Sequence, residues 1–329
     1  MIIKGISVVI CCYNSATKLP NTLEYLAKQI FKNDINFELI IVDNNCKDTT
    51  VETAKKVWNL FGNPYPLSII CESKAGLSFA RKKGIQAAIY DYIVLCDDDN
   101  WLCVDYLVKV HSLFNLMPEV SLIGGVGQAV ADIPFPDWFT NMDGFGYAIG
   151  SEGRITGIVD TVYGAGMCLR KSAVQPLLAN GFCFALTDRT GIGLSSGGDM
   201  EICEILKSLD HKIYLDTSLT FKHFLNKERL TWGYYLNLRR AFGKASAYIQ
   251  LYTITIPTKS PIYKSGLSEI LSLFNFGIRN INYIFFPNLY KNINCANAVQ
   301  QLTLRITCLL EKKQMNNVIR HIRMNRKNV

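Results

Sequence analysis

Apolar and polar positions alternate between two periods over the first hundred residues. Four short runs rich in β-branched and other apolar residues (6–11, 37–42, 67–71 and 92–96) are typical of buried strands. Between them lie stretches whose apolar residues recur every three or four positions, such as Leu19, Leu23 and Leu26, which predict amphipathic helices. Strands that alternate with helices indicate an α/β fold of the Rossmann-like kind, with a mostly parallel central sheet.

The pattern changes twice further along the chain. Residues 121–224 combine short apolar runs with glycine-rich loops, and helical periodicity returns at Leu230. Residues 270–310 read as two amphipathic helices interrupted at Pro287. We therefore expect a catalytic unit over residues 1–229 and a helical C-terminal region over 230–329. No run approaches the ~18 apolar residues that span a bilayer, and the start of the chain lacks the pattern of a signal peptide.

The net charge of +8 is concentrated at the end of the chain. Residues 312–329 contain Lys312, Lys313, Arg320, Arg323, Arg326 and Lys327 but no acid. Together with the amphipathic helices, this tail suggests docking on an anionic membrane surface; a solvated tail beside a packed helical pair is the alternative. Nucleic acid is a poorer partner, because such binding needs a folded basic surface lined with aromatic side chains.

The eleven cysteines show no Cys-x-x-Cys spacing and lie mostly within apolar runs. We interpret them as buried, reduced thiols, which indicates the cytoplasm rather than an oxidising compartment.

Three consecutive aspartates, Asp97, Asp98 and Asp99, directly follow the fourth apolar run. Adjacent carboxylates raise one another's pKa unless a cation neutralises them. Oxygen ligands of this kind suit Mg²⁺ or Mn²⁺, which usually retain phosphates and waters as further ligands. A turn followed by a helix cap is the alternative. The residues after the first run, Cys12-Tyr13-Asn14-Ser15, form neither a Gly-x-Gly-x-x-Gly motif nor a P-loop, so a metal is the expected partner of an anionic cofactor.

Four motifs in this order resemble those of the family 2 glycosyltransferases with the GT-A fold. They are Val8 to Asn14, Ile41-Val42-Asp43-Asn44-Asn45, Ala75 to Arg81, and Leu95 to Asn100. The resemblance extends over residues 5–245 or so, and it implies an inverting enzyme that uses a nucleotide-diphosphate sugar, with a UDP-sugar as the expected donor.

The resemblance assigns roles to the residues of the donor site. Asp43 would contact the nucleotide base, and Cys12, Tyr13 and Asn14 would line its pocket. Arg81 would lie near the donor phosphates. An Asx turn or a helix cap is the alternative for Asp43, and a solvated helix position is the alternative for Arg81.

In the same way, the triplet would be the Asp-x-Asp element of that family. Asp97 and Asp98 would face the donor, with Asp97 toward the ribose, and Asp99 would hold the metal. His223 follows a strand-like segment where the family often has a further metal ligand, although a histidine at a strand end is often structural.

Inverting transfer needs a carboxylate that takes the proton of the attacking hydroxyl. Asp199, near the predicted start of a helix, is our candidate for this general base, with an N-cap role as the compatible alternative. The family usually has Glu-Asp here with another acid two places on, whereas this chain has Gly198, Asp199 and Glu201. Glu201 is therefore a candidate to share the work.

Further residues are expected at the acceptor. Gly164, Ala165 and Gly166 would form a floor that permits close backbone approach. Trp232, like Trp138, would stack on a sugar ring, with a buried core position as the alternative.

The leading hypothesis is therefore transfer of one sugar to a saccharide or lipid-linked hydroxyl in cell-surface polysaccharide synthesis, in the cytoplasm or peripherally on the inner face of the membrane. An inactive GT-A domain that only binds nucleotide-sugar or glycan is the alternative. A nucleotidylyltransferase would need a glycine-rich loop after the first strand, and none is present.

Overall fold

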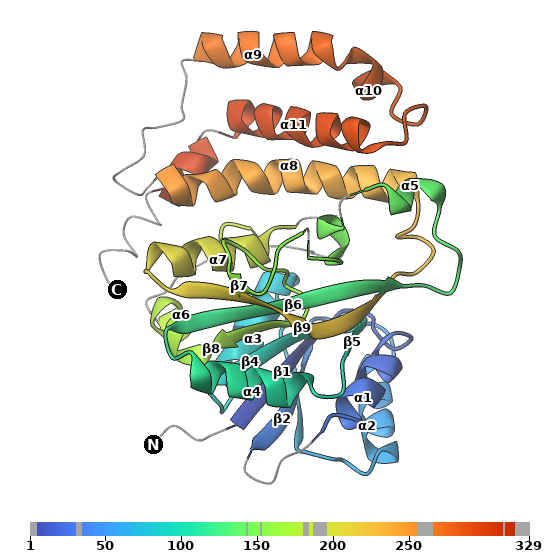
Figure 1. Cartoon of the computed structure of the whole chain (residues 1–329), viewed down its shortest axis with the longest axis vertical. Helices are drawn as coiled ribbons and strands as arrows, with labels where there is room; N and C mark the ends of the chain where they lie inside the picture. Colours follow the sequence, from blue (N-terminus) through green and yellow to red (C-terminus); the bar gives the residue numbers. More distant parts are fainter. Residues whose placement is uncertain are drawn as a thin grey trace.

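The computed structural model describes residues 5–30, 35–142, 144–151, 153–179, 184–186, 196–254, 266–311 and 313–319. Within these ranges, one β-sheet carries helices on both faces, and further helices extend from one side (Figure 1). The strands are β1 Gly5–Cys12, β2 Asn36–Asp43, β3 Leu67–Cys71, β4 Tyr92–Asp97, β5 Asn100–Leu102, β6 Val120–Val130, β7 Gly157–Ile158, β8 Met167–Arg170 and β9 Lys212–Phe224.

The helices follow the predicted order. They are α1 Leu19–Ala27, α2 Thr50–Leu60, α3 Leu77–Ala87, α4 Tyr106–Leu116, α5 Asp137–Thr140, α6 Lys171–Ala179, α7 Gly198–Ser208, α8 Trp232–Ile254, α9 Gly266–Arg279, α10 Ile281–Phe285 and α11 Ile293–Leu310, with a 3₁₀ turn at Phe145–Tyr147. The boundary predicted after residue 229 lies between β9 and α8.

The sheet has the strand order β3-β2-β1-β4-β8-β6-β9-β5, with β7 beside β9. The first four strands in this order are parallel, as their alternation with helices predicts. The second half is mixed, because β8, β5 and β7 each run antiparallel to their neighbours while β6 and β9 are parallel. The α/β class is confirmed; of the three antiparallel strands, β7 and β8 come from the glycine-rich middle of the chain, and β5 directly follows β4.

The register of the parallel strands brings their carboxyl ends to one edge. Cys12 pairs with Asp43, and Cys11 pairs with Asp97. Residues that are 31 and 86 positions apart in the sequence therefore become neighbours at a single edge, where ligands bind in sheets of this kind.

The two faces of β1 bury different sets of helices, because successive side chains of a strand point in opposite directions. Ile6, Val8 and Ile10 pack in a cluster that also contains residues of α1, α2 and α4. Val9 packs instead in a cluster with residues of α3, α6 and α7. Both faces are covered, which explains why the strands are continuous apolar runs rather than alternating ones.

The C-terminal helices extend outward in successive layers, with α8 on α7, α11 on α8, and α9 on α11 (Figure 1). Pro287 falls between α10 and α11, as expected from its interruption of the amphipathic pattern, although the first predicted helix is divided into α9 and α10. No helix among the residues that the structure describes is both long and apolar enough to cross a membrane.

One expectation about the cysteines was wrong. Cys12, Cys96, Cys168, Cys203 and Cys295 are buried, but Cys71 is exposed because it ends β3, whose side chains are only partly covered. All ten cysteines in the described residues are free thiols; Cys183 lies outside them.

The close contact of α3 with the sheet provides a test of the packing. A Cβ atom at Gly84 would lie 2.3 Å from Cγ1 of Val9 and 3.2 Å from Cγ2 of Val42. We expect Gly84→Val to reduce the free energy of unfolding by at least about 1–3 kcal/mol, the usual effect of overpacking a core. Urea denaturation measures it. The exposed neighbour Lys83, changed to valine, supplies the control for helix propensity; equal losses in both variants would contradict this packing.

Candidate functional site

A cavity of about 960 Å³ opens at the carboxyl edge of β1 and β4. The start of α3, the segment around Gly164, the start of α7 and one side of α8 form its other walls. Most of the residues predicted from the sequence line it: Cys12, Tyr13, Arg81, Asp97, Asp98, Asp99, Gly164, Ala165, Asp199 and His223. Five others do not line it: Asn14, Asp43, Gly166, Glu201 and Trp232.

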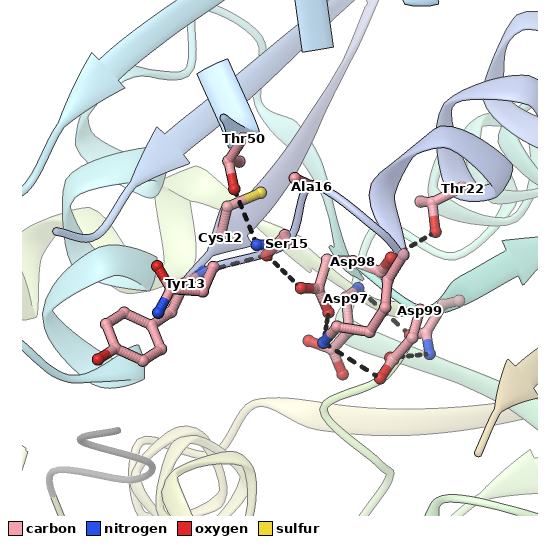
Figure 2. Close-up of polar contacts among 12 residues, drawn as sticks. Cys12, Tyr13, Ser15, Ala16, Thr22, Thr50, Asp97, Asp98 and Asp99 are labelled. Atoms are coloured by element: carbon pink, nitrogen blue, oxygen red, sulfur yellow. Dashed lines mark hydrogen bonds and ion pairs between the residues drawn. The ribbon is translucent and has the colours of Figure 1, made fainter. Parts of the chain in front are cut away.

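Asp98, the middle aspartate of the triplet, is contacted by the loop between β1 and α1 (Figure 2). Ser15 Oγ donates a hydrogen bond to Asp98 Oδ2, and Lys18 Nζ lies 3.0 Å from Oδ1. Ser15 is itself fixed by a hydrogen bond of 2.8 Å from its backbone N–H to Thr50 Oγ1. Burial raises the pKa of Asp98, against the effect of Lys18. Both carboxylate oxygens are thus engaged within the fold, so Asp98 anchors the β1–α1 loop to the end of β4.

Asp99 faces a different set of partners. β5 pairs antiparallel with β9, and Asn100 lies opposite His223 in this register. Asp99 Oδ1 therefore lies 3.4 Å from His223 Nε2, and Oδ2 lies 3.0 Å from Nη1 of Arg229. Burial by itself raises the pKa of Asp99, but His223, Arg229 and Lys18 outweigh it, so the carboxyl pKa falls well below its usual value. Asp99 is held as a carboxylate.

The donor atoms beside Asp99 fit a divalent ion of the Mg²⁺ or Mn²⁺ kind. Among the described residues, no cluster of three or more His, Cys, Asp or Glu side chains has the geometry of a metal site. However, these ions commonly take only one or two protein ligands and complete their shell with phosphates and waters. Asp99 and His223 could supply such a pair. His223 Nδ1 lies 2.6 Å from the carbonyl oxygen of Tyr147, a backbone contact that orients a ligating imidazole.

Arg81 and Asp97 lie together on the other side of the triplet. Arg81 on α3 is buried, and its Nη2 atom lies 3.5 Å from Asp97 Oδ1. A Cβ atom at Gly164 would lie 2.7 Å from Arg81 Nη2 and 3.1 Å from Cβ of Asp199. Gly164 therefore lies between the two side chains, and any larger residue would displace one of them.

Asp199 occupies the first turn of α7, where its carboxylate lines the cavity. Oδ2 accepts a hydrogen bond of 2.9 Å from the backbone N–H of Gly164, and Oδ1 accepts one of 2.9 Å from the N–H of Met200. Each carboxylate oxygen can accept more than one hydrogen bond, so these contacts orient the group and still permit it to accept a proton.

The residues expected around the nucleotide base differ in placement. Tyr13 is exposed at the cavity, whereas Asn14 turns toward the next loop, where its Oδ1 accepts a hydrogen bond of 2.7 Å from the N–H of Lys47. Asp43 Oδ1 accepts one of 2.9 Å from the N–H of Cys46, which is the turn role considered as its alternative. Its contact with a base stays a prediction.

Two residues expected at the acceptor, Gly166 and Trp232, do not line the cavity. Gly166, at φ +66°, packs against Tyr106, whose hydroxyl donates a hydrogen bond of 2.6 Å to the Gly166 carbonyl. Trp232 is buried beside Trp138, and its Nε1–H donates one of 2.8 Å to the carbonyl of Pro287. The core position considered for Trp232 is the one that it occupies.

Glu201 is fully buried and points away from the cavity. Its carboxylate accepts hydrogen bonds from the backbone N–H groups of Ala185 and Leu186, at 2.6 and 3.0 Å, and from the hydroxyl of Tyr252. It thus ties the start of α7 to the segment before it and to the end of α8. This placement does not support a share in proton transfer, because Asp199, two positions earlier, faces another direction on the helix.

Sequence reasoning missed several polar residues of the cavity, among them Asn44, Lys18 and Arg229. Asn44 lines it and joins β2 to the start of α3 through a hydrogen bond of 2.9 Å that its Oδ1 accepts from the N–H of Gly76. Lys18 and Arg229 neutralise the triplet. Asn44 stood within a quoted motif, but Lys18 and Arg229 lie outside every motif, so only the fold reveals them.

The fold is an α/β domain of the GT-A kind, with acidic side chains at the sheet edge and a carboxylate across the cavity. Residues 7–152 match the profile of Glycosyl transferase family 2. This match, over somewhat less than half of the chain, confirms the resemblance noted from its motifs.

Curated relatives match part of the chain. It is 30% identical to the protein EpsH of Bacillus subtilis over 102 residues, which cover 31% of this chain and 28% of EpsH. It is 31% identical to the cholesterol galactosyltransferase of Borreliella burgdorferi over 96 residues, which cover 29% of this chain and 25% of that enzyme. The match therefore spans little more than a quarter of either relative.

Solved structures extend the likeness in fold. The crystal structure of residues 1–349 of S. aureus TarS in complex with UDP has a TM-score of 0.50 and 12% sequence identity, over 94% of this chain and 91% of that one. The complex of the same protein with UDP-GlcNAc has the same TM-score and coverage. At this identity the likeness shows the fold alone, and it includes the helices that follow the sheet.

The buried contacts of Glu201 predict a structural role. In Glu201→Gln, only one oxygen remains to accept a hydrogen bond, and the NH₂ group faces the backbone N–H of Ala185 or Leu186. One buried N–H group therefore loses its acceptor, and we expect a loss of about 1–3 kcal/mol in the free energy of unfolding. Thermal and urea unfolding measure it. Glu204→Gln on the same helix is the control, since it removes only the ion pair with Lys207. Reduced turnover at unchanged stability would instead return Glu201 to the catalytic group.

Proposed function

We propose that this chain transfers one sugar from a nucleotide-diphosphate sugar, with a UDP-sugar as the expected donor, to a hydroxyl of a saccharide or lipid-linked acceptor, and that it inverts the anomeric centre. The main observation behind this proposal is the position of Asp199. Its carboxylate is fixed by two backbone N–H groups at the wall of the cavity that also contains Asp97 and Asp99. A role in cell-surface polysaccharide synthesis is the setting we favour.

The donor side of the proposal rests on the charged groups of the cavity. Arg81, Lys18 and Arg229 line it beside the acidic triplet, and the first residues of α3 line it as well. Cationic side chains and the N-terminus of a helix favour a bound diphosphate. S. aureus TarS, which shares the fold, was crystallised with UDP and with UDP-GlcNAc. These two complexes support a nucleotide diphosphate as a ligand of this chain.

A divalent ion, Mn²⁺ or Mg²⁺, would be held by Asp99 and His223. When bound, it would offset the negative charge that develops on the leaving diphosphate. The chain's own groups act around it. Asp98 and Ser15 fix the loop that follows β1, and Arg81 holds Asp97 at the edge of the sheet.

The acceptor side of the proposal rests on general base catalysis. In an inverting transfer, the acceptor hydroxyl attacks the anomeric carbon from the face opposite the leaving group, and its proton passes to a carboxylate. Asp199 has the contacts for this task, because Gly164 and Met200 fix its orientation without enclosing it. Gly164 and Ala165 form the adjacent wall, and the absence of a side chain at Gly164 leaves room for Arg81 and Asp199 at the cavity.

The substitution Asp199→Asn tests this role. Asparagine retains an oxygen that can accept from Gly164 or Met200, but it cannot take up a proton, so we expect turnover to fall by about 10²- to 10⁴-fold. Release of nucleotide diphosphate from a panel of donor sugars measures turnover, and donor-dependent thermal stabilisation measures binding. We expect binding to be unchanged.

Asp132→Asn, at an exposed position outside the cavity, is the matched control. Full turnover in Asp199→Asn would exclude Asp199 as the base. Stabilisation of the wild-type chain by a donor without any turnover would favour the binding-only GT-A domain.

We also propose that the chain docks on an anionic membrane from the cytoplasmic side, where a lipid-linked acceptor would lie. The outer surface of α9 and α10 and the turn after them is apolar. Ile270, Leu271, Phe274, Ile278, Ile281, Phe285, Phe286 and Leu289 each expose half or more of their surface, between 51% and 74%. We call this set the α9–α10 surface. α9 lies at the outer end of the stacked helices, away from the sheet (Figure 1).

The charge of the surrounding segment supports anionic lipid as the occupant of this surface. Residues 266–329 contain nine Lys and Arg but only two acids, Glu269 and Glu311, so they account for +7 of the chain's net +8. Most of the basic tail lies outside the described residues. An apolar surface within a basic segment is the combination that binds anionic lipid headgroups and the acyl boundary below them.

The double substitution Phe274→Glu and Phe285→Glu tests the docking. We expect at least a tenfold loss of co-sedimentation with vesicles containing phosphatidylglycerol, because two charges would have to enter the headgroup layer. Leu60→Glu with Leu116→Glu introduces the same charges at residues 73% and 78% exposed on α2 and α4, and it should bind like the wild-type chain.

No binding of the wild-type chain to these vesicles would refute the docking. Self-association that the substitutions at 274 and 285 abolish would assign the surface to a second copy of the chain.

A further inference from the structure

We propose that Arg229 is an internal cation that occupies the position of the divalent ion and must withdraw before that ion binds. This inference rests on the metal site of the proposed function. It assigns Arg229 a positioning role: the guanidinium neutralises the acidic triplet in the free protein and is released toward the cavity when the metal enters.

A single nitrogen atom of Arg229 contacts both expected metal ligands. Nη1 lies 3.0 Å from Asp99 Oδ2 and 3.1 Å from His223 Nε2. The two ligands are 3.4 Å apart at their closest atoms, Asp99 Oδ1 and His223 Nε2. A cation that binds Asp99 and His223 together therefore competes with the guanidinium for the same lone pairs.

His223 Nε2 cannot form good hydrogen bonds with both of its neighbours, Arg229 and Asp99, at once. Its Nδ1 atom lies 2.6 Å from the Tyr147 carbonyl oxygen, which can only accept, so Nδ1 carries a hydrogen. Nε2 has one position left, with which it can either accept a hydrogen bond from Arg229 or donate one to Asp99. It cannot do both. A metal ion satisfies the Nε2 lone pair and the carboxylate at once.

One buried nitrogen atom of the Arg229 side chain lacks a hydrogen-bond partner among the described residues. Arg229 belongs to the segment between β9 and α8, only 8% of its surface is exposed, and this nitrogen atom is its Nε. A buried donor without a partner costs free energy. Because Arg229 lines the cavity, a guanidinium that leaves Asp99 would meet the phosphates of a donor, which could satisfy Nε as well as both Nη atoms.

Metal and donor binding are then coupled through this side chain. The ion must displace Arg229, so its affinity for the free protein is reduced, and the released guanidinium adds to the attraction for the diphosphate. Binding of each would strengthen binding of the other, as linkage requires.

The test measures binding of Mn²⁺ alone, without nucleotide or acceptor, by electron paramagnetic resonance of the free ion and by isothermal titration. In Arg229→Gln we expect the Kd for Mn²⁺ to fall by tenfold or more, a change of about 1.4 kcal/mol in binding free energy. Arg229→Lys keeps the positive charge beside Asp99 and should remain near the wild-type value.

Arg240→Gln is the matched control. Arg240 lines the same cavity, but its Nη1 atom pairs with Asn237 Oδ1 at 2.7 Å rather than with the triplet. Losing this charge should change the Kd by less than threefold, the effect of a more distant charge in salt solution. Circular dichroism verifies folding; if Arg229→Gln is unfolded, Arg229→Met retains the stem beside the Tyr147 ring, 5.9 Å from the guanidinium carbon.

An unchanged or higher Kd in Arg229→Gln would overturn the proposal, as would equal tightening in Arg229→Gln and Arg240→Gln. Because no sugar is transferred in this measurement, its outcome is separate from that of Asp199→Asn. If Asp199→Asn loses turnover but Arg229→Gln binds Mn²⁺ like the wild-type chain, the proposed transferase activity is retained. Only the proposed competition between Arg229 and the metal ion is then refuted.

Discussion

The site depends on the neutralisation of three adjacent carboxylates at the end of one strand. Each is paired with a different partner: Asp97 with Arg81, Asp98 with Ser15 and Lys18, and Asp99 with His223 and Arg229. Such a cluster would be unstable in a buried position without these cations, because like charges and loss of hydration both oppose ionisation. The arrangement keeps Asp99 ionised while Asp98 is anchored within the fold.

The partners of the triplet come from three distant segments of the chain, so the site forms only when the whole sheet is assembled. Lys18 follows β1, Arg81 lies on α3, and Arg229 follows β9. The antiparallel pairing of β5 with β9 is decisive, since it sets Asp99 beside His223 and brings the segment before α8 over the cavity. α8 then closes one side with Arg240 and Lys244, so the C-terminal helices contribute to the wall of the site as well as to its support.

Two acidic residues close together in the sequence also have different roles at α7. Asp199 and Glu201 are two positions apart, yet one lines the cavity and the other is buried against Ala185 and Tyr252. The helical repeat separates them by about 200°, so they cannot face the same site. Asp43 and Asn44, at the end of β2, also have different roles: the first closes a turn, and the second bridges β2 to the start of α3 at the cavity.

The sequence by itself determined the parallel half of the sheet, the position of the acidic triplet at its edge and the resemblance to the family 2 glycosyltransferases, because apolar periodicity and local motifs encode them directly. It also indicated Asp199 and His223, which the fold brings to one cavity. Only the tertiary structure decided that Glu201 and Trp232 are buried away from that cavity and that Lys18 and Arg229 neutralise the triplet. These facts depend on strand register and helix packing between residues as distant as Asp99 and Arg229, and no local pattern records such pairings.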